Sequence, residues 1–240
     1  MKTLKVTLQV AITICFTFFI INYSSAQPTT REVSGDITEN TTWADDTILV
    51  TGDIVVNEDI TLSINPGTWI KFQGNYGIEV HGYLVAEGIP GDTIIFTRMD
   101  TLGFSNYSNN QGGWKGLAFV SDGTHQDTSR LSLCKISFVK CIENNYGGIY
   151  NSGTHKLKIW NCTIENNFAY QYGGGIYSSG SQGATLLITD CMITNNYAGQ
   201  YGGGIYGTYK TRIINSSITD NYSGQWGGGI YLGYCDDIIS

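Results

Sequence analysis

The chain has 240 residues, of which 13 are basic and 20 acidic, so its net charge at pH 7 is −7. If a leader that includes Lys2 and Lys5 is removed, 11 basic residues remain against 20 acidic ones, a net charge of −9. So few cations disfavour nucleic acid or an anionic membrane surface as a partner.

Residues 1–26 have the pattern of a secretory signal peptide. Lys2 and Lys5 supply a positively charged start, residues 6–21 are mostly apolar, and Ser24-Ser25-Ala26 provides the small residues before a cleavage point. A retained membrane anchor is disfavoured because the apolar core is only about 16 residues long and polar residues follow it. We therefore expect cleavage after Ala26, a secreted or cell-surface location, and no membrane span in the mature chain.

Residues 27–130 are expected to form an N-terminal cap followed by irregular coils. Short runs rich in β-branched and aromatic residues alternate here with turn signals such as Asn65-Pro66-Gly67. Strands this closely spaced leave no room for crossover helices. The expected strands are Thr47–Val50, Ile54–Val56, Ile60–Ile64, Trp69–Phe72, Ile78–Ala86, Thr93–Thr97 and, after a polar loop at 100–113, Trp114–Phe119.

Residues 131–240 contain an internal repeat. The segment Gly173–Tyr177, with the sequence Gly-Gly-Gly-Ile-Tyr, recurs at Gly202–Tyr206 and Gly227–Tyr231 and in a shorter form at Gly147–Tyr150, with isoleucines 27, 29 and 25 residues apart. Such a period indicates a solenoid, propeller or array. The glycines and β-branched residues disfavour helices, and a propeller blade needs about 40 residues. The predicted fold class is therefore all-β, a parallel β-helix with three short strands in each coil of about 25–29 residues.

A second motif precedes each glycine segment and contains an expected turn position. Asn161, Asp190 and Asn215 occupy this position in successive units. Asn and Asp are the side chains that best tolerate left-handed backbone angles. We therefore expect these three residues to form a structural turn ladder along the solenoid.

A column of small thiols accompanies the turn ladder. Cys134, Cys162 and Cys191 occupy equivalent positions, which Ser216 continues in the next unit. We expect the thiols to point inward and to be buried. We also expect them to be reduced, because in-register parallel neighbours lie about 4.8 Å apart, farther than the roughly 3.8 Å between the Cβ atoms of a disulfide.

The repeated units, with Ile-x-x-Asn at Ile164–Asn167, Ile193–Asn196 and Ile218–Asn221, resemble the right-handed parallel β-helix repeats of bacterial surface proteins. They are similar to the repeats of chlamydial polymorphic outer-membrane proteins, with Ile where those usually have Phe. The upstream segments Leu62–Thr68, Gly82–Gly88 and Trp114-Lys115-Gly116 resemble the N-terminal part of secreted β-helix proteins of Bacteroidetes. The resemblance implies a right-handed β-helix of the pectin-lyase-like type. Such scaffolds host both enzymes and adhesins, so the fold alone does not decide the function.

The acidic and histidine side chains do not form a catalytic or metal-binding pattern. Polysaccharide hydrolysis needs paired carboxylates, and lysis needs a calcium cluster beside a basic residue. The candidate acids do not align in neighbouring coils and are interpreted as solvated or turn residues: Glu143, Glu165, Asp190, Asp220, Asp236 and Asp237. His81, His125 and His155 lack the spacing of metal ligands. We therefore expect no catalytic residue here, no bound metal and no cofactor.

Aromatic residues are the surface feature with functional content. Twelve of the 16 tyrosines lie between Cys134 and Ser240. Aromatic rows bind the faces of sugars and also stack on one another, so a glycan-binding platform and simple ladder packing both stay open. The position before the glycines holds Tyr146, Tyr172, Tyr201 and Trp226. The candidate glycan-binding residues are the expected outward column together with one tryptophan: Tyr150, Tyr177, Tyr206, Tyr231 and Trp226.

The sequence therefore predicts a secreted or cell-surface β-helix with a structural or adhesive role, whose partner is a polysaccharide or another cell-surface component. The alternative is a polysaccharide-degrading enzyme, a lyase or glycosidase, whose catalytic coils lie beyond residue 240. Enzymatic activity stays open, although the lack of clustered acids favours a non-enzymatic role. Because Asp237-Ile238-Ile239 begins another coil, the repeats of residues 131–240 are expected to continue beyond Ser240.

Overall fold

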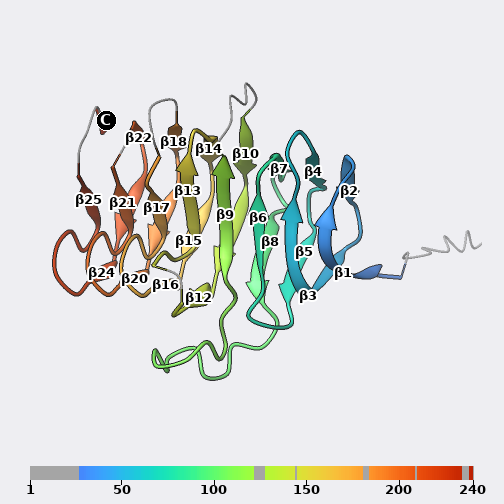
Figure 1. Ribbon diagram of the computed structural model, residues 1–240, viewed down its shortest axis with the longest axis horizontal. Helices are drawn as coiled ribbons and strands as arrows, with labels where there is room; N and C mark the ends of the chain where they lie inside the picture. Colours follow the sequence, from blue (N-terminus) through green and yellow to red (C-terminus); the bar gives the residue numbers. More distant parts are fainter. Residues whose placement is uncertain are drawn as a thin grey trace, which may run out of the picture.

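The computed structural model describes residues 27–121, 128–143, 145–180, 184–208, 210–233 and 238–239. The expected signal peptide at 1–26, as well as His125, Asp236 and Asp237, lies outside these residues. All regular structure in the described ranges is β-strand, and none of it is a helix long and apolar enough to cross a membrane. Figure 1 shows the strands stacked into an elongated solenoid.

Each coil passes through three faces in a fixed order, and the strands of each face pair in parallel. The first face contains β5 (Trp69–Phe72), β8 (Ile94–Arg98), β11 (Cys134–Ser137), β15 (Thr163–Glu165), β19 (Met192–Thr194) and β23 (Ser217–Thr219). The second face contains β6 (Gly77–Val80), β9 (Gly116–Ser121), β13 (Ile149–Gly153), β17 (Ile176–Ser178), β21 (Ile205–Gly207) and β25 (Ile230–Leu232).

The third face contains β2 (Thr41–Trp43), β4 (Thr61–Ile64), β7 (Tyr83–Glu87), β10 (Ser129–Ser132), β14 (Lys156–Trp160), β18 (Thr185–Thr189), β22 (Thr211–Ile214) and β26 (Ile238–Ile239). A short fourth sheet lies between the first and second faces in chain order. Its strands are β12 (Lys140–Cys141), β16 (Phe168–Ala169), β20 (Tyr197–Ala198) and β24 (Tyr222–Ser223). This arrangement confirms the predicted parallel β-helix.

The N-terminal coils are less regular than the later ones. Strand β3 (Thr47–Val56) is one continuous strand whose first half pairs with β5 and whose second half pairs with β6, so it belongs to both faces. Strand β1 (Thr30–Ile37) follows β3 along both halves, with a register irregularity between Val33 and Gly35. The two runs expected at Thr47–Val50 and Ile54–Val56 are therefore joined.

The single strand expected at Ile78–Ala86 is wrong. The chain turns between β6 and β7, so that the two halves of this apolar run lie on different faces. Gly82 lies in the turn, where an added Cβ atom would collide with the carbonyl oxygens of Asn57 and Ile60. Every strand of a solenoid buries alternate residues, so the alternation of apolar and polar residues continues through the turn. The alternation therefore does not reveal where the turn lies.

The interior is filled by alternate residues of all three faces. The repeated isoleucines Ile149, Ile176 and Ile205 lie in register and are fully buried. Each such side chain contributes roughly 1.5–3 kcal/mol when it is buried. Stacking buries one coil against the next, and this is why the coil cannot be stable alone. The glycine clusters exist for a steric reason, because a Cβ atom on Gly174 would collide with the carbonyl oxygens of Tyr197 and Gly203 in the following coil.

The Asn-Asn pairs of the repeat serve two different purposes. The first residue of each pair has a positive φ, 55° at Asn166 and 53° at Asn195. The second residue forms an internal amide ladder of Asn167, Asn196 and Asn221. In it each Nδ2 donates to a backbone carbonyl oxygen, and the Nδ2 groups of Asn167 and Asn196 also donate to the Oδ1 of the next member at 3.0 Å. Asn167 and Asn196 are buried.

The polar loop expected at 100–113 contains no strand and is fixed to the solenoid by a buried lysine. Lys140 Nζ donates to the carbonyl oxygens of Gly103, Phe104 and Asn106 at 2.8–3.1 Å. Tyr107 stacks on Phe168 of β16, with ring centroids 4.4 Å apart. The loop therefore covers the short fourth sheet, and Figure 1 shows it projecting from one side of the solenoid.

Candidate functional site

The outward column of the second face changes its chemistry along the solenoid. Tyr150 pairs in register with Tyr177, and the column continues through Tyr206 to Tyr231. In the opposite direction the equivalent positions are Ala118 and then Glu79. The tyrosine column therefore ends at Ala118, where the regular repeat begins.

A second column runs beside the first. Tyr146, Tyr172, Tyr201 and Trp226 are linked to one another by parallel bridges. Rings of the two columns stack within and across coils, as in Tyr146–Tyr150 at 4.3 Å, Tyr201–Trp226 at 5.2 Å and Tyr206–Tyr231 at 5.3 Å between centroids. We call this set the aromatic array: Tyr146, Tyr150, Tyr172, Tyr177, Tyr201, Tyr206, Trp226 and Tyr231.

Stacking limits what the aromatic array can offer to a ligand. Interplanar angles of 9–26° in most of its pairs mean that the rings are stacked with their faces toward one another. The exceptions lie in the middle, where Tyr177 is tilted by 36° against Tyr150 and by 81° against Tyr206, and Tyr172 is tilted by 37° against Tyr206. Burial among the neighbouring rings raises the pKa of Tyr177 and of Tyr206. The middle of the array is therefore primarily a packing device, and Trp226 at its far end is 60% exposed.

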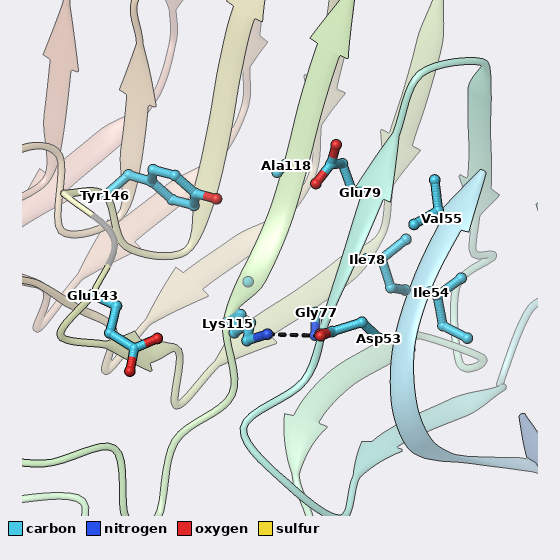
Figure 2. Close-up of a pocket in the computed structure, with 11 residues that line it drawn as sticks. Asp53, Ile54, Val55, Gly77, Ile78, Glu79, Lys115, Ala118, Glu143 and Tyr146 are labelled. Carbon is cyan, nitrogen blue, oxygen red and sulfur yellow. Dashed lines mark hydrogen bonds and ion pairs between the residues drawn. The ribbon is translucent and has the colours of Figure 1, made fainter. Parts of the chain in front are cut away.

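A groove opens where the array ends. Because Ala118 carries only a methyl group, a hollow of about 380 Å³ lies between the coils at this point. Figure 2 shows the Tyr146 ring and the Glu79 carboxylate on either side of Ala118. We call this hollow the acidic groove and define it by Asp53, Glu79, Lys115, Ala118, Glu143 and Tyr146, which come from four successive coils.

Three carboxylates and one ammonium line the acidic groove. Lys115 Nζ lies 2.7 Å from Asp53 Oδ2, and Asp53 Oδ1 accepts a hydrogen bond from the backbone N–H of Gly77. Glu79 lies 2.7 Å from Nε2 of His81. The side chains of Asp53 and Glu79 are 52% and 50% exposed, and Glu143 is also exposed. The groove thus combines an aromatic ring with accessible hydrogen-bond acceptors and an excess of negative charge.

Two carboxylates of the acidic groove are solvated and lie beside basic side chains. General-acid catalysis by a carboxyl group depends on an apolar, desolvated environment, whereas Asp53 and Glu79 are half exposed and contact basic side chains. The part of the chain that the structure describes contains no group of three or more His, Cys, Asp or Glu side chains arranged to hold a metal ion. The groove brings a few acceptor side chains together beside an aromatic ring.

The predicted turn and thiol residues lie away from this groove. Asn161, Asp190 and Asn215 have φ angles of 52°, 53° and 46°, and Nδ2 of Asn215 donates to Oδ1 of Asp190. The thiols of Cys134, Cys162 and Cys191 are buried and free, and each donates to the carbonyl oxygen two residues before it.

The candidate acids and histidines are dispersed. Glu165 pairs with Lys135 at 2.7 Å on the first face. Asp220 lies in a turn with a φ of 53°, at the position of Asn166 and Asn195. His155 is buried and contacts Ser129. Of the six acids, Glu143 alone lines the acidic groove among those described.

Sequence reasoning missed Asp53, Glu79 and Lys115. These residues belong to the irregular coils, where the pairing interval varies from 17 residues for Thr30 and Thr47 to 45 residues for Val85 and Arg130. Without a constant period their positions could not be aligned. The one signal in the sequence was that the tyrosine column ends before Tyr150. It could be recognised only once Ala118 was known to pair with Tyr150.

Comparison with protein families gives one match. The family model described as "Right handed beta helix region" matches residues 122–239, which span the regular coils. Comparisons with curated proteins and with solved structures give no match.

Proposed function

Since the chain is a right-handed parallel β-helix repeat protein, we propose that it acts outside the cell as an adhesive scaffold that binds glycans through its second face. The observation that supports this proposal is the acidic groove, which opens at the end of the aromatic array between Tyr146 and Glu79. The expected signal peptide at 1–26 supports export.

A sugar ring fits the chemistry of the acidic groove. Its hydroxyl groups are hydrogen-bond donors, and the carboxylates of Glu79 and Glu143 are acceptors with several lone pairs each. Its apolar C–H face can pack on the ring of Tyr146, since aromatic side chains offer a large apolar surface. Three carboxylates against the one ammonium of Lys115 favour a neutral sugar or an amino sugar over a uronate.

The aromatic array then has a supporting role. Its middle rings contact one another, some stacked and some tilted, so they support Tyr146 and Tyr150 by packing. This differs from a platform in which Tyr177, Tyr206 and Tyr231 each bind a sugar. A glycan that extends beyond the groove would meet ring edges and the exposed Trp226.

The sharpest test fills the groove by extending the array. In Ala118→Tyr, a tyrosine would occupy the position next to Tyr150 and continue the stacking, so the protein should fold while the hollow is lost. We expect the wild-type protein to bind neutral or amino-sugar glycans on a glycan array, and we expect Ala118→Tyr and Glu79→Gln to lose this binding. Tyr222→Ala is the control, because Tyr222 is equally aromatic and 60% exposed but lies on β24, outside the groove.

The outcomes separate binding from packing. Retained binding by a folded Ala118→Tyr variant would place the glycan elsewhere. No glycan binding by a well-folded wild-type protein would leave the aromatic array with its packing role alone. Loss of binding in Tyr222→Ala would show that the effect is not specific to the groove.

A polysaccharide-degrading enzyme is the second candidate, and one observation favours it. Glu79 and Glu143 line the same hollow from different coils, and paired carboxylates are the machinery of glycoside hydrolysis. The test is release of reducing ends from a panel of polysaccharides, with Glu143→Gln as the variant. Turnover that disappears in Glu143→Gln would make this reading the correct one.

A further inference from the structure

The third face carries a group of cations that the proposed glycan site does not use. Its outward positions place Lys158 of β14, Leu187 of β18 and Arg212 of β22 in one register column. Lys210 directly precedes β22 beside this column. Lys158, Lys210 and Arg212 are all exposed. Three of the 11 basic residues that follow residue 26 thus gather in one region of the third face of an acidic protein.

A hollow of about 300 Å³ lies among these cations. We call it the basic groove and define it by Lys158, Thr185, Leu187, Lys210 and Arg212. Leu187 is half-buried and interrupts the column of charged side chains, so the groove has an apolar floor between cationic walls. Lys158 and Arg212 are separated by two strand spacings, or about 10 Å.

The cations of the basic groove have no structural partners. Several other basic side chains of the solenoid are paired with acids, as in Lys115–Asp53, Arg130–Glu87 and Lys135–Glu165. Within the described ranges, Lys158, Lys210 and Arg212 form no ion pair and no side-chain hydrogen bond. Folding therefore does not require their charges, and a ligand with negative groups would meet three uncompensated cations.

We propose that the basic groove binds an anionic polysaccharide, which carries sulfate or carboxylate groups at intervals along a sugar backbone. Lys158 and Arg212 would contact anionic groups on either side of Leu187, and the C–H surface of the intervening sugar would cover that leucine. Arg adds a planar, bidentate contact to sulfate or carboxylate that Lys cannot make. Only three cations on a chain that is otherwise acidic are too few for a nucleic acid duplex, whose affinity depends on many phosphate contacts.

This inference does not depend on the proposed function, because it concerns another face and the opposite charge. A protein with both grooves would hold a neutral or amino-sugar glycan on one face and an anionic polysaccharide on another. It would then cross-link two components of an extracellular matrix instead of attaching to one.

The experiment measures binding of the purified protein to dextran sulfate, with uncharged dextran as the matched probe and polygalacturonate to separate carboxylate from sulfate. The test variant is Lys158→Gln/Arg212→Gln. The control is Lys71→Gln/Lys135→Gln, which removes the same net charge from the first face. Circular dichroism checks that both variants fold.

We expect the wild-type protein to bind one or both polyanions but not dextran, with affinity that falls as salt is added. The test variant should bind about tenfold more weakly, since each exposed ion pair contributes modestly. The control should bind like the wild type. Three results would overturn the proposal: no polyanion binding by the wild type, equal binding by the test variant, or an equal loss in the control. Tighter binding of duplex DNA than of either polysaccharide would also overturn it.

Discussion

Asn196, in the middle of the internal amide ladder, allows the contribution of the ladder to stability to be measured. Its side chain makes four hydrogen bonds. Nδ2 donates to the carbonyl oxygen of Ile164 at 2.9 Å and to Oδ1 of Asn221 at 3.0 Å, and Oδ1 accepts from the backbone N–H and Nδ2 of Asn167 at 3.1 and 3.0 Å. The residue is only 1% exposed, so water cannot replace these bonds without opening the coil.

The expected effect of Asn196→Ala follows from these contacts. A hydrogen bond contributes about 1 kcal/mol net, and a buried group left without a partner costs more. Loss of four bonds predicts destabilisation of about 4 kcal/mol, a large part of the 5–15 kcal/mol that stabilises a typical domain. Asn221→Ala should cost less, about 2 kcal/mol, because Asn221 makes three side-chain hydrogen bonds and is only half-buried.

Urea unfolding followed by tryptophan fluorescence measures the change, and hydrogen exchange of the surrounding amides shows where it acts. The exchange measurement is needed because repeat proteins unfold in local units as well as globally. Asn145→Ala is the control, since Asn145 is exposed and its side chain lies outside the ladder. If Asn196→Ala destabilised the protein by less than about 1 kcal/mol, or no more than Asn145→Ala, the ladder would not stabilise the coils in the way its geometry indicates.

Two further predictions concern titratable groups in the stacked columns. Burial raises the pKa of the Cys162 thiol, and the hydrogen bond between Cys191 and Cys162 raises the pKa of the Cys191 thiol. Both thiols should therefore resist iodoacetamide at pH 8 in the folded protein and react with it in urea. Peptide mass spectrometry that found either residue labelled in the native protein would contradict this. Burial raises the pKa of Tyr177 and Tyr206 above 10.0, so the unfolded chain releases protons above about pH 10 that the folded protein retains. The melting temperature should be insensitive to these tyrosines below pH 10 and should fall as the pH rises further. A smaller fall in Tyr177→Phe/Tyr206→Phe would support this reasoning. A wild-type melting temperature that stays constant above pH 10 would oppose it.

The regular coils could be predicted from the sequence because equivalent residues recur at nearly constant intervals, which give the register of the strands. Ile149, Ile176, Ile205 and Ile230 recur at nearly constant intervals, and the structure pairs them directly. The internal amide ladder shows where this reasoning stops. The sequence contains Asn166-Asn167 and Asn195-Asn196, but both residues of a pair are polar, and nothing in the alternation says which one turns inward.

The irregular coils could not be aligned in the same way. The partner of Glu79 is Ala118, 39 residues later, because the loop at 100–113 lies between them. A loop of unknown length removes the period on which the alignment depends. The acidic groove requires both this register and the absence of a large side chain at Ala118, so it became visible only when the coils were stacked in space.

The positions of the two grooves have a common physical basis. In a parallel β-helix, a side chain that repeats in register stacks on its own kind, as the rings of Tyr206 and Tyr231 do, and its surface is then covered by its neighbours. Ligand-binding surface is left where a column changes its type of side chain. Ala118 lies between Glu79 and Tyr150, and Leu187 lies between Lys158 and Arg212. The stacking that stabilises the solenoid and the binding proposed for it therefore use different positions of the same columns.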